Sequence, residues 1–209
     1  MAGVCALLMQ QGHIDAALEE AIRFYLYLRP CESRRAKVGH FTFPQAGTNP
    51  GLQHYGLVIG PIDEGRPAKN QVFDDTVLFD STPWLAELIA ARIAGRPPQA
   101  AIFQTDAKAL LRIWNAAVKT LRMPKSVQYQ LRHGGPSEDA LARRRTPLEI
   151  MQRGRWTCYA SVNRYTKPGQ LQRYLSEIPP DVRTYNQTCL AYLPDILAGR
   201  VSAPATPLP

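Results

Sequence analysis

The sequence predicts a mainly α-helical fold with a small antiparallel β-sheet, that is, an α+β protein. Three observations support this prediction. Most of the chain has apolar residues at the three- and four-residue spacing of amphipathic helices. Three short segments between residues 40 and 80 are instead rich in aromatic and β-branched residues, which favour strands. Tight connections separate these segments, and such connections indicate antiparallel pairing.

The first helix is expected at residues 14–28, with Asp15 as its N-cap. Pro30 interrupts this helix, and a second short helix is expected at residues 31–38. Aromatic and β-branched residues bounded by Gly and Pro then predict the strands. These strands are expected at residues 40–43, 54–59 and 74–80.

The second half of the chain is predicted to be helical. Asp106 is the expected cap of a helix over residues 106–122, and Thr146 forms a capping box with Glu149. Gly154 is the expected C-terminal end of that second helix. Further helices are expected at residues 83–95, 136–145, 157–166, 169–178 and 182–199.

Length and composition fit a globular protein with a basic surface. The 209 residues are enough to bury a core without disulfides or metal. Lysine and arginine number 25 against 17 aspartate and glutamate, a formal net charge of +8. This surplus favours a polyanionic partner such as nucleic acid, although a generally basic surface also explains it.

Cysteines and histidines give no sign of a metal site or a disulfide framework. The four cysteines form no C-x-x-C pair, and the four histidines include no i, i+4 pair beside a carboxylate. The sequence has no run of 18 apolar residues and no secretory leader. We therefore expect reduced thiols, no metal or other cofactor, no membrane partner and an intracellular protein, in the nucleus if the source is eukaryotic and otherwise in the cytoplasm.

Residues 129–167 concentrate the chemistry of the chain, because many fixed cations surround Tyr165 there. Cleaving a phosphodiester without a metal needs an in-line nucleophile, cations on the non-bridging oxygens and an acid for the leaving alkoxide. Arginine binds phosphate oxygens with its planar fork, and nearby cations ease formation of a tyrosine phenolate. This segment therefore predicts that Tyr165 attacks a DNA phosphodiester.

An ordered set of motifs resembles the catalytic domain of the tyrosine recombinases, the phage integrase family. The set is LRPCES at 28–33, a lysine in a predicted hairpin, YQLRH at 129–133, GRW at 154–156 and RY at 164–165, with Tyr165 nine residues after Trp156. The pattern RGRW-x5-V-x-RY-x-K resembles recombinases of eukaryotic mobile elements of the Crypton and DIRS kind. The resemblance covers residues 14–175.

The resemblance implies how a phosphate would be bound and a leaving group protonated. Arg29 and Arg132 would bind the scissile phosphate, with Glu32 as the structural partner of Arg29. The alternative for Arg29 is a helix-end arginine paired with Glu32 on the surface. Lys69 would be the general acid for the leaving 5′ oxygen, and Arg66 is its nearby rival.

The resemblance also implies the nucleophile. Tyr165 would attack the phosphate, and Trp156 lies where the family has histidine or tryptophan, with a packed core tryptophan as the alternative. Tyr129 replaces the family's histidine, and a phenol can donate a hydrogen bond to phosphate but cannot act as a base near neutral pH. His133 is expected to be a buried structural histidine. The competing tyrosines nearby are Tyr159 and Tyr174.

Seven further cations are expected to contact flanking DNA phosphates, which carry no sequence information. A solvated helix face is the alternative for the central run of three. The seven residues are Arg143, Arg144, Arg145, Arg153, Arg155, Arg164 and Lys167.

The family resemblance implies a site-specific DNA recombinase or integrase. Tyr165 would form a 3′-phosphotyrosyl link that retains the energy of the broken bond, so that no nucleotide cofactor is needed. The expected partners are double-stranded DNA and further copies of the chain, as a homotetramer on two duplexes. Residues 1–175 would form the catalytic domain, without the N-terminal DNA-clamping domain usual in the family, followed by a helical extension at 176–199 and a disordered tail at 200–209.

Two other functions stay open at the level of the sequence. Tyr129 and the missing N-terminal domain fit a DNA-binding protein that keeps the fold but has lost recombination. A nicking and closing enzyme of the type IB topoisomerase kind would use the same tyrosine chemistry.

Overall fold

The computed structural model describes residues 1–49, 52–65, 67–68, 71–163, 165 and 168–207. The strands are β1 (Phe41–Thr42), β2 (Gly56–Ile59) and β3 (Asp75–Leu78). The helices are α1 (Ala2–Gln10), α2 (Ile14–Tyr25), α3 (Pro30–Arg35), α4 (Pro83–Ile93), α5 (Ala107–Thr120), α6 (Leu131–Leu141), α7 (Pro147–Gly154), α8 (Tyr159–Val162), α9 (Pro168–Ser176), α10 (Pro180–Ala191) and α11 (Leu193–Leu197). Short 3-10 turns lie at η1 (Val38–His40), η3 (Ile62–Glu64) and η4 (Gln128–Gln130).

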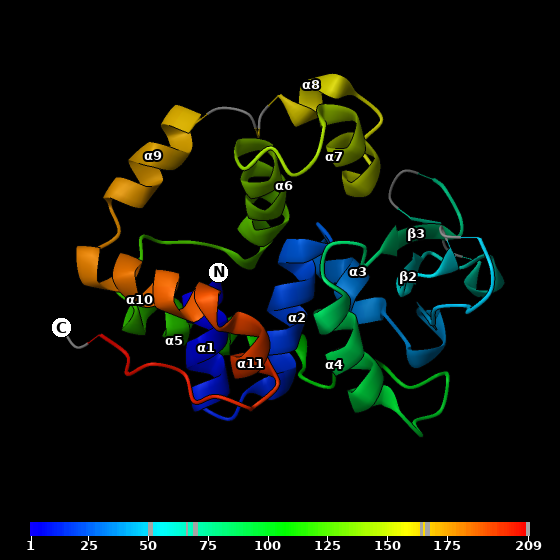
Figure 1. Cartoon of the computed structure of the whole chain (residues 1–209), viewed down its shortest axis with the longest axis horizontal. Helices are drawn as coiled ribbons and strands as arrows, with labels where there is room; N and C mark the ends of the chain where they lie inside the picture. The colour runs from blue at the N-terminus through cyan, green and yellow to red at the C-terminus, as the bar shows by residue number, and fades with distance from the viewer. Residues whose placement is uncertain (50–51, 66, 69–70, 164, 166–167, 208–209) are drawn as a thin grey trace.

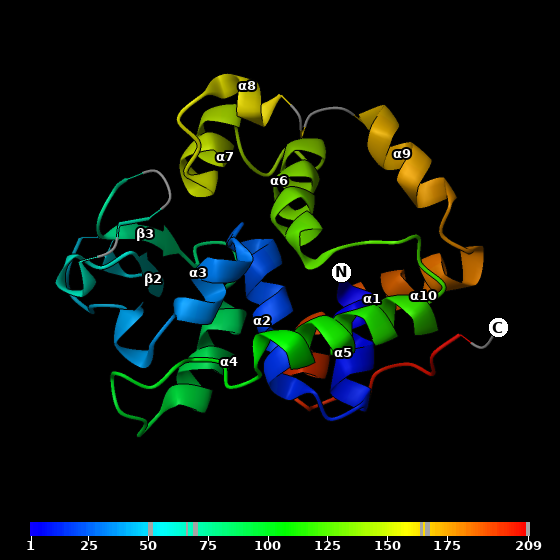
Figure 2. The same cartoon turned by 180° about the vertical axis from the view of Figure 1, so that it is seen from behind.

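Helix α2 lies at the centre of the molecule (Figure 1). The sheet lies on one side of α2, and α1, α5, α10 and α11 gather on the other side, as the view from behind also shows (Figure 2). Helices α6, α7 and α8 lie beyond one end of α2, and α6 packs directly against α2. The residues predicted to bind phosphate therefore lie on elements that meet at this end of α2.

The sheet confirms the predicted fold class. In the part of the chain that the structure describes, three strands pair antiparallel in the order β1-β2-β3. Leu57 lies opposite Phe41 on one neighbouring strand and opposite Val77 on the other, and all three side chains are buried. The protein is thus a mainly helical α+β fold with a small antiparallel sheet.

Two helix starts have the predicted caps. The carboxylate of Asp106 accepts hydrogen bonds from the backbone N–H groups of Lys108 and Ala109, at 2.8 and 3.1 Å. Thr146 and Glu149 form the reciprocal capping box, in which the N–H of Thr146 donates to Glu149 Oε2 at 2.6 Å. These caps satisfy N–H groups that a helix leaves open at its first turn.

Asp15 is not the cap of α2, which is a correction to the prediction. His13 holds that position, and Asp15 lies in the first turn of the helix. The carboxylate of Asp15 instead accepts a hydrogen bond from Arg92 Nε of α4 at 2.6 Å. A long-range ion pair has taken the place of a local cap.

Helix α1 has no counterpart in the sequence-based prediction. Seven of its nine residues are buried, and it packs against α2, α5, α10 and α11. Because a helix that is buried on most sides shows no amphipathic period, the spacing of apolar residues cannot reveal it. Every helix in the described ranges, α1 included, is too short or too polar to cross a membrane.

Helix α6 begins earlier than the prediction for residues 136–145, because its first residue is Leu131 and Pro136 lies inside it. Proline prefers the first turn of a helix, which is why the sequence favours a start there. Gly135 explains the difference. A Cβ at Gly135 would overlap the carbonyl oxygen of Phe24 and lie 2.9 Å from the Tyr27 ring. Close packing on α2 thus extends α6 toward its N-terminus.

The C-terminal helices pack against the N-terminal ones. The backbone N–H of Gly3 in α1 donates to Asn186 Oδ1 in α10 at 2.9 Å. The described part of the terminal segment, for which the sequence predicts disorder, lies against α1. Gln10 Nε2 donates there to the carbonyl oxygens of Ala203 and Pro204, at 3.1 and 2.7 Å.

Candidate active site

A buried carboxylate, Glu32, gathers three arginines of the described chain. Arg29 Nη1 lies 2.5 Å from Glu32 Oε1, and Arg155 Nη2 lies 2.6 Å from Oε2. Arg132 Nη1 is more distant, at 3.7 Å from Oε2. We call Arg29, Arg132 and Arg155 the arginine cluster. The fold therefore brings together the two arginines predicted to bind phosphate, and adds a third that is predicted to contact flanking DNA.

Each arginine of the cluster comes from the end of a helix. Arg29 is the N-cap of α3, where its backbone N–H donates to Glu32 Oε2 at 2.7 Å. Arg132 lies in the first turn of α6. Arg155 directly follows α7 in the left-handed conformation, with φ of 54°. The ends of three helices thus converge on one carboxylate.

Backbone carbonyls hold two of these guanidinium groups in place. Arg132 donates to the carbonyl oxygens of Tyr27 and Gly154, the latter at 2.6 Å. Arg155 donates to the same carbonyl of Tyr27 at 3.3 Å and to that of Arg153 at 3.0 Å. Arg155 Nε is buried and has no hydrogen-bond partner among the described residues. These contacts fix the position of the cluster. In the described chain, the Nε–H group of Arg155 remains available as a hydrogen-bond donor.

The arginine cluster carries excess positive charge. Its three guanidinium groups face two carboxylates in the described chain, because Asp75 Oδ2 of β3 lies 3.9 Å from Arg155 Nε, in addition to Glu32. Burial, together with repulsion from Arg29 and Arg155, lowers the pKa of Arg132 to about 10. Burial opposes ionisation of Glu32, but attraction to Arg155 and the other arginines holds the pKa of its carboxyl below the ordinary value. Among the described residues, the cluster therefore has three cations and two carboxylates.

Trp156 connects the arginine cluster to Tyr165. The guanidinium carbon of Arg132 lies 5.1 Å from the centroid of the Trp156 ring, a cation–π contact. The Tyr165 ring stacks on Trp156 with centroids 4.8 Å apart. Gly154 makes room for this indole, because a Cβ at position 154 would overlap the Trp156 ring.

Helix α7 ends at Gly154, as the sequence predicts. The residue that follows, Arg155, adopts the left-handed conformation. A left-handed non-glycine residue costs on the order of 1–2 kcal/mol. The hydrogen bonds of the Arg155 side chain to Glu32 and two carbonyls offset this cost.

Tyr165 is held by contacts on both sides. Its backbone N–H donates to the carbonyl of Val162 at 2.8 Å, and the fully buried Val162 anchors α8 beneath it. Its hydroxyl lies 2.8 Å from His133 Nδ1 of α6. Its exposed fraction is 7%. The predicted nucleophile is therefore fixed in position beside an imidazole.

Tyr129 does not take the place of that imidazole. It lies in η4, is 43% exposed and meets the His133 ring edge to face with centroids 4.9 Å apart. The tyrosine thus packs on His133. The Tyr165 ring also stacks on His133, at 5.3 Å between centroids. His133 is half-buried, and its contact with the Tyr165 hydroxyl goes beyond the structural role that the sequence predicts.

Three predicted residues lie outside the described residues. They include the predicted general acid, Lys69, which belongs to the connection between β2 and β3. The strand that follows this connection begins at Asp75, whose carboxylate lies 3.9 Å from Arg155 Nε. The three residues are Lys69, Arg164 and Lys167.

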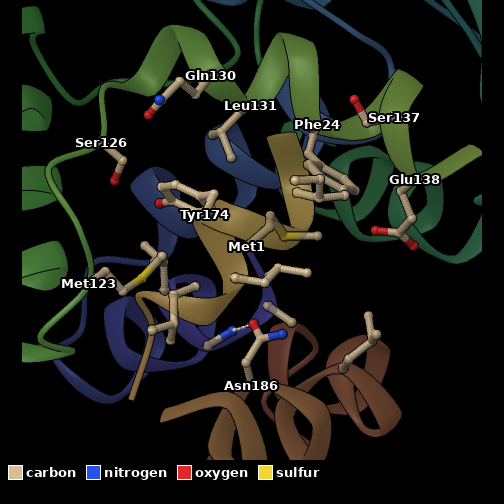
Figure 3. A pocket seen from close by; sticks show the side chains of 18 of the residues that line it. Met1, Phe24, Met123, Ser126, Gln130, Leu131, Ser137, Glu138, Tyr174 and Asn186 are labelled. Atoms are coloured by element: carbon tan, nitrogen blue, oxygen red, sulfur yellow. Dashed lines mark hydrogen bonds between the residues drawn. The ribbon is translucent and has the colours of Figure 1, made fainter. Parts of the chain in front are cut away.

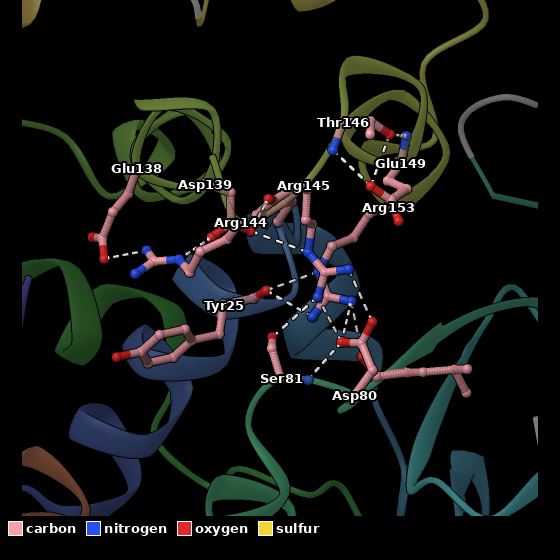
Figure 4. A network of polar contacts seen from close by, with 12 residues as sticks. Tyr25, Asp80, Ser81, Glu138, Asp139, Arg144, Arg145, Thr146, Glu149 and Arg153 are labelled. Atoms are coloured by element: carbon pink, nitrogen blue, oxygen red, sulfur yellow. Dashed lines mark hydrogen bonds and ion pairs between the residues drawn. The ribbon is translucent and has the colours of Figure 1, made fainter. Parts of the chain in front are cut away.

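Arg145 and Arg153 bond to protein groups from several elements (Figure 4). Arg145 donates to both oxygens of Asp80, at 2.7 and 2.9 Å, and to Asp139 at 3.1 Å. Arg153 donates to Asp80 at 3.1 Å and to the carbonyl of Tyr25 at 2.9 and 3.1 Å. These bonds tie the sheet to α2, α6 and α7. A DNA contact would require either guanidinium to exchange these partners.

The other two members of the arginine run differ in exposure. Arg144 pairs with Glu138 and with Asp139, the latter at 2.9 Å, and its side chain is 49% exposed. Arg143 is exposed and adopts the left-handed conformation, with φ of 53°. Arg143 is therefore the member of the run best placed to reach an external phosphate.

A cavity of about 930 Å³ borders Tyr165 and His133. It lies between α1, α5, α6, α9 and α10, and the close view shows Leu131, Phe24 and Tyr174 around it (Figure 3). Tyr174, one of the competing tyrosines, therefore lines this mostly apolar space, whereas Tyr159 is 53% exposed on α8. Trp156 instead stacks with the rings of Tyr27 and Tyr165.

Sequence reasoning misses two features of this site. Arg155 joins the arginine cluster. His133 hydrogen-bonds the Tyr165 hydroxyl, although His133 and Tyr165 are 32 positions apart in the sequence. Helical period and local motif carry no signal for contacts at such separation. The adjacency of Arg155 to Trp156, and of His133 to Arg132, is the nearest available indication.

Comparison with known proteins gives no assignment. No protein-family model matches the chain, and no curated protein matches it significantly. Within the described ranges, no three His, Cys, Asp or Glu side chains come together in a way that would hold a metal ion.

Proposed function

We propose that this protein is a DNA strand transferase of the tyrosine recombinase kind, in which Tyr165 attacks a DNA phosphodiester. The observation that carries the proposal is that Trp156 contacts both Tyr165 and Arg132, a member of the arginine cluster. Double-stranded DNA is the proposed partner, and a homotetramer is the proposed assembly during exchange. Its proposed place is inside the cell, in the nucleus if the source is eukaryotic.

The charge of the arginine cluster matches that of a phosphodiester. Burying a cation without a counter-charge is costly, and one bound phosphodiester would supply the single negative charge that balances the cluster. Burial is the main cause of the lowered pKa of Arg132, and repulsion from Arg29 and Arg155 adds to it. Guanidinium forks bind phosphate oxygens in pairs, so the ligand chemistry agrees with the charge.

The proposed reaction is an in-line displacement. The Tyr165 oxygen forms a bond to phosphorus while the bond from phosphorus to the 5′ oxygen breaks. Arg29 and Arg132 stabilise the negative charge that develops on the non-bridging oxygens. Lys69 supplies a proton to the 5′ oxygen in this proposal, as the family resemblance implies. Attack by another 5′ hydroxyl on the phosphotyrosine then reverses the step and completes strand exchange.

A covalent trapping experiment tests the proposal. The chain first enriches binding sequences from a random DNA pool, and these are built into duplexes nicked so that the cleaved 5′ fragment diffuses away. We expect the wild-type protein to form a denaturant-resistant adduct with this DNA and Tyr165→Phe to form none.

Tyr159→Phe and Tyr174→Phe are the matched controls, because they remove hydroxyls near Tyr165 in the sequence that lie outside the proposed chemistry. Both should keep the adduct. An adduct that persists in Tyr165→Phe, or a wild-type protein that binds the selected DNA and never forms one, would contradict the proposal.

A second candidate is a DNA-binding protein without cleavage activity. Two observations favour it: Tyr129 stands in the place of the family's histidine, and Tyr165 is only 7% exposed. Binding of the selected DNA without any adduct would support this candidate. Relaxation of supercoiled DNA without strand exchange would instead support an enzyme of the type IB topoisomerase kind.

A further inference from the structure

We infer that His133 is the general base that takes the proton of Tyr165, an inference that rests on the proposed function. The inference starts from position 129, where the recombinase family has a histidine and this chain has a tyrosine. His133 Nδ1 lies 2.8 Å from the Tyr165 hydroxyl, within the range in which a proton can pass directly between the two groups.

Ring contacts fix the position of His133. Its ring contacts those of Tyr129 and Tyr165, with centroids 4.9 and 5.3 Å away. The preceding residue on α6 is Arg132, which is 1% exposed and bonded to two carbonyls. One turn of α6 therefore places a phosphate-binding cation and a base at fixed positions relative to each other.

Tyr129 cannot supply this base itself. A phenol has an ordinary pKa of about 10, whereas imidazole titrates near 6.5 and accepts a proton at neutral pH. Tyr129 is also 43% exposed, and its ring contacts the imidazole of His133. Its role in this arrangement is to hold His133, which makes it a positioning residue.

Charged and titratable groups lie near His133 on several elements. Arg132 precedes it on α6, and Trp156 contacts both Arg132 and Tyr165. The other titratable or charged groups on the shared cavity are Glu138, Tyr174, Arg183, Tyr185 and the amino group of Met1. A neutral imidazole can accept a proton near neutral pH.

The proton balance of the step is complete. Neutral His133 with its proton on Nε2 accepts the phenol proton at Nδ1 as the Tyr165 oxygen bonds to phosphorus. The bond to the 5′ oxygen breaks, and that oxygen receives a separate proton from the general acid. In the reverse step, imidazolium returns its proton to the Tyr165 oxygen as the phosphotyrosine bond breaks.

A kinetic experiment tests the inference with the trapping duplexes described above. For the wild-type protein, the rate of adduct formation should rise with pH through about 6.5 and then level off. In His133→Gln this limb should vanish, and the rate near pH 7 should fall by about a hundredfold or more. His54→Gln changes an exposed histidine outside the site and should leave both unchanged.

Chemical rescue separates a base from a merely structural residue. Added imidazole should restore part of the adduct rate in His133→Ala, because free imidazole can accept the phenol proton in the space left by the side chain. Equal rates and equal pH profiles for the wild-type protein and His133→Gln would overturn the inference while the proposed function stands. A wild-type protein that forms no adduct at any pH would overturn the proposed function, and the inference with it.

A measurement on the unmodified chain covers the case in which these variants do not fold. NMR of ring-labelled histidine, without DNA, should show that neutral His133 carries its proton on Nε2 and presents a bare Nδ1 to Tyr165. A proton on Nδ1 of the neutral ring would overturn the inference, because His133 would then donate to the phenol.

Discussion

Two buried glutamates have pKa values displaced in opposite directions. Glu32 meets three guanidinium groups, and their attraction outweighs burial and lowers the pKa of its carboxyl. Burial raises the pKa of Glu20 to about 7, because Glu19 adds repulsion and Arg23 compensates only in part. In the described chain Glu19 and Glu20 both pair with Arg23. The first site holds excess positive charge and the second excess negative charge.

Glu20→Gln should remove a pH dependence of stability. The pKa of Glu20 is higher in the folded protein than in the unfolded chain, so its contribution is present below about pH 4.3 and is lost as the pH rises through about 7. This loss amounts to about 3 kcal/mol, because one pKa unit corresponds to about 1.4 kcal/mol. The variant should therefore show a flatter profile of unfolding free energy between those pH values, measured by denaturant titration.

The exposed Glu87 provides the matched control. Glu87→Gln should leave the pH profile of the wild-type protein unchanged. Parallel profiles for the wild-type protein and Glu20→Gln would show that the carboxyl of Glu20 ionises equally easily in the folded and unfolded states.

At the scale of elements, the end of α7 holds the site together. Arg153 bonds to the sheet and to α2, Arg155 joins the arginine cluster, and Trp156 folds back over Gly154. Four consecutive residues thus connect the sheet, the arginine cluster and Tyr165. A change in how this short segment packs should disturb all three.

Gly154→Ala should destabilise the protein and displace Trp156. The added Cβ would overlap the indole ring, and forcing a methyl group into a packed site costs about 1–3 kcal/mol. Denaturant unfolding measures the first effect, and tryptophan fluorescence together with adduct formation measures the second. The contact with Tyr165 depends on the indole position, so we expect the adduct rate to fall as well.

Gly169→Ala is the control for this substitution. A Cβ at Gly169 in α9 would meet no atom within 4 Å, and alanine favours a helix over glycine by up to about 1 kcal/mol. This variant should be as stable as the wild-type protein or slightly more so. Equal stability of Gly154→Ala and Gly169→Ala would contradict the packing argument.

At the scale of the whole molecule, the net charge of +8 does not translate directly into a DNA-binding surface. Arg145 and Arg153 neutralise Asp80, and Arg144 neutralises Glu138 and Asp139. The basic residues that look equivalent in the sequence therefore fall into two groups. One group pairs with carboxylates of the fold, and the other, which includes Arg143, is exposed.

Arg143→Ala and Arg145→Ala should separate these groups. Arg143→Ala should reduce the slope of log affinity against log salt concentration by about one without changing stability, because the side chain is exposed. Arg145→Ala removes partners of Asp80 and Asp139 and should lower the free energy of unfolding by about 2 kcal/mol. Salt-dependent DNA binding and denaturant unfolding of both variants provide the measurements. Equal effects of the two variants on both quantities would contradict the division.

Much of the fold follows from patterns within short windows of the sequence. The three strands, the cap at Asp106 and the capping box at Thr146 are all local, and all three are confirmed. Predictions from short windows of sequence fail where a residue contacts a part of the chain that is distant in sequence. Asp15 pairs with Arg92 and does not cap α2, and contact with Phe24 and Tyr27 extends α6 through Pro136. The buried helix α1 shows no period at all.

The candidate site also combines features that are visible in the local sequence with features that arise only on folding. The amino-acid order already contains its components: two arginines, a tryptophan and a tyrosine at suggestive spacing, with a cationic surplus around them. Tertiary packing settles how they are used, because it places Arg155 on Glu32, His133 on the Tyr165 hydroxyl, and Arg145 on Asp80. The physical reason is that a charged or titratable side chain acts on whatever lies within a few ångströms, and residues far apart in the chain become neighbours through folding alone.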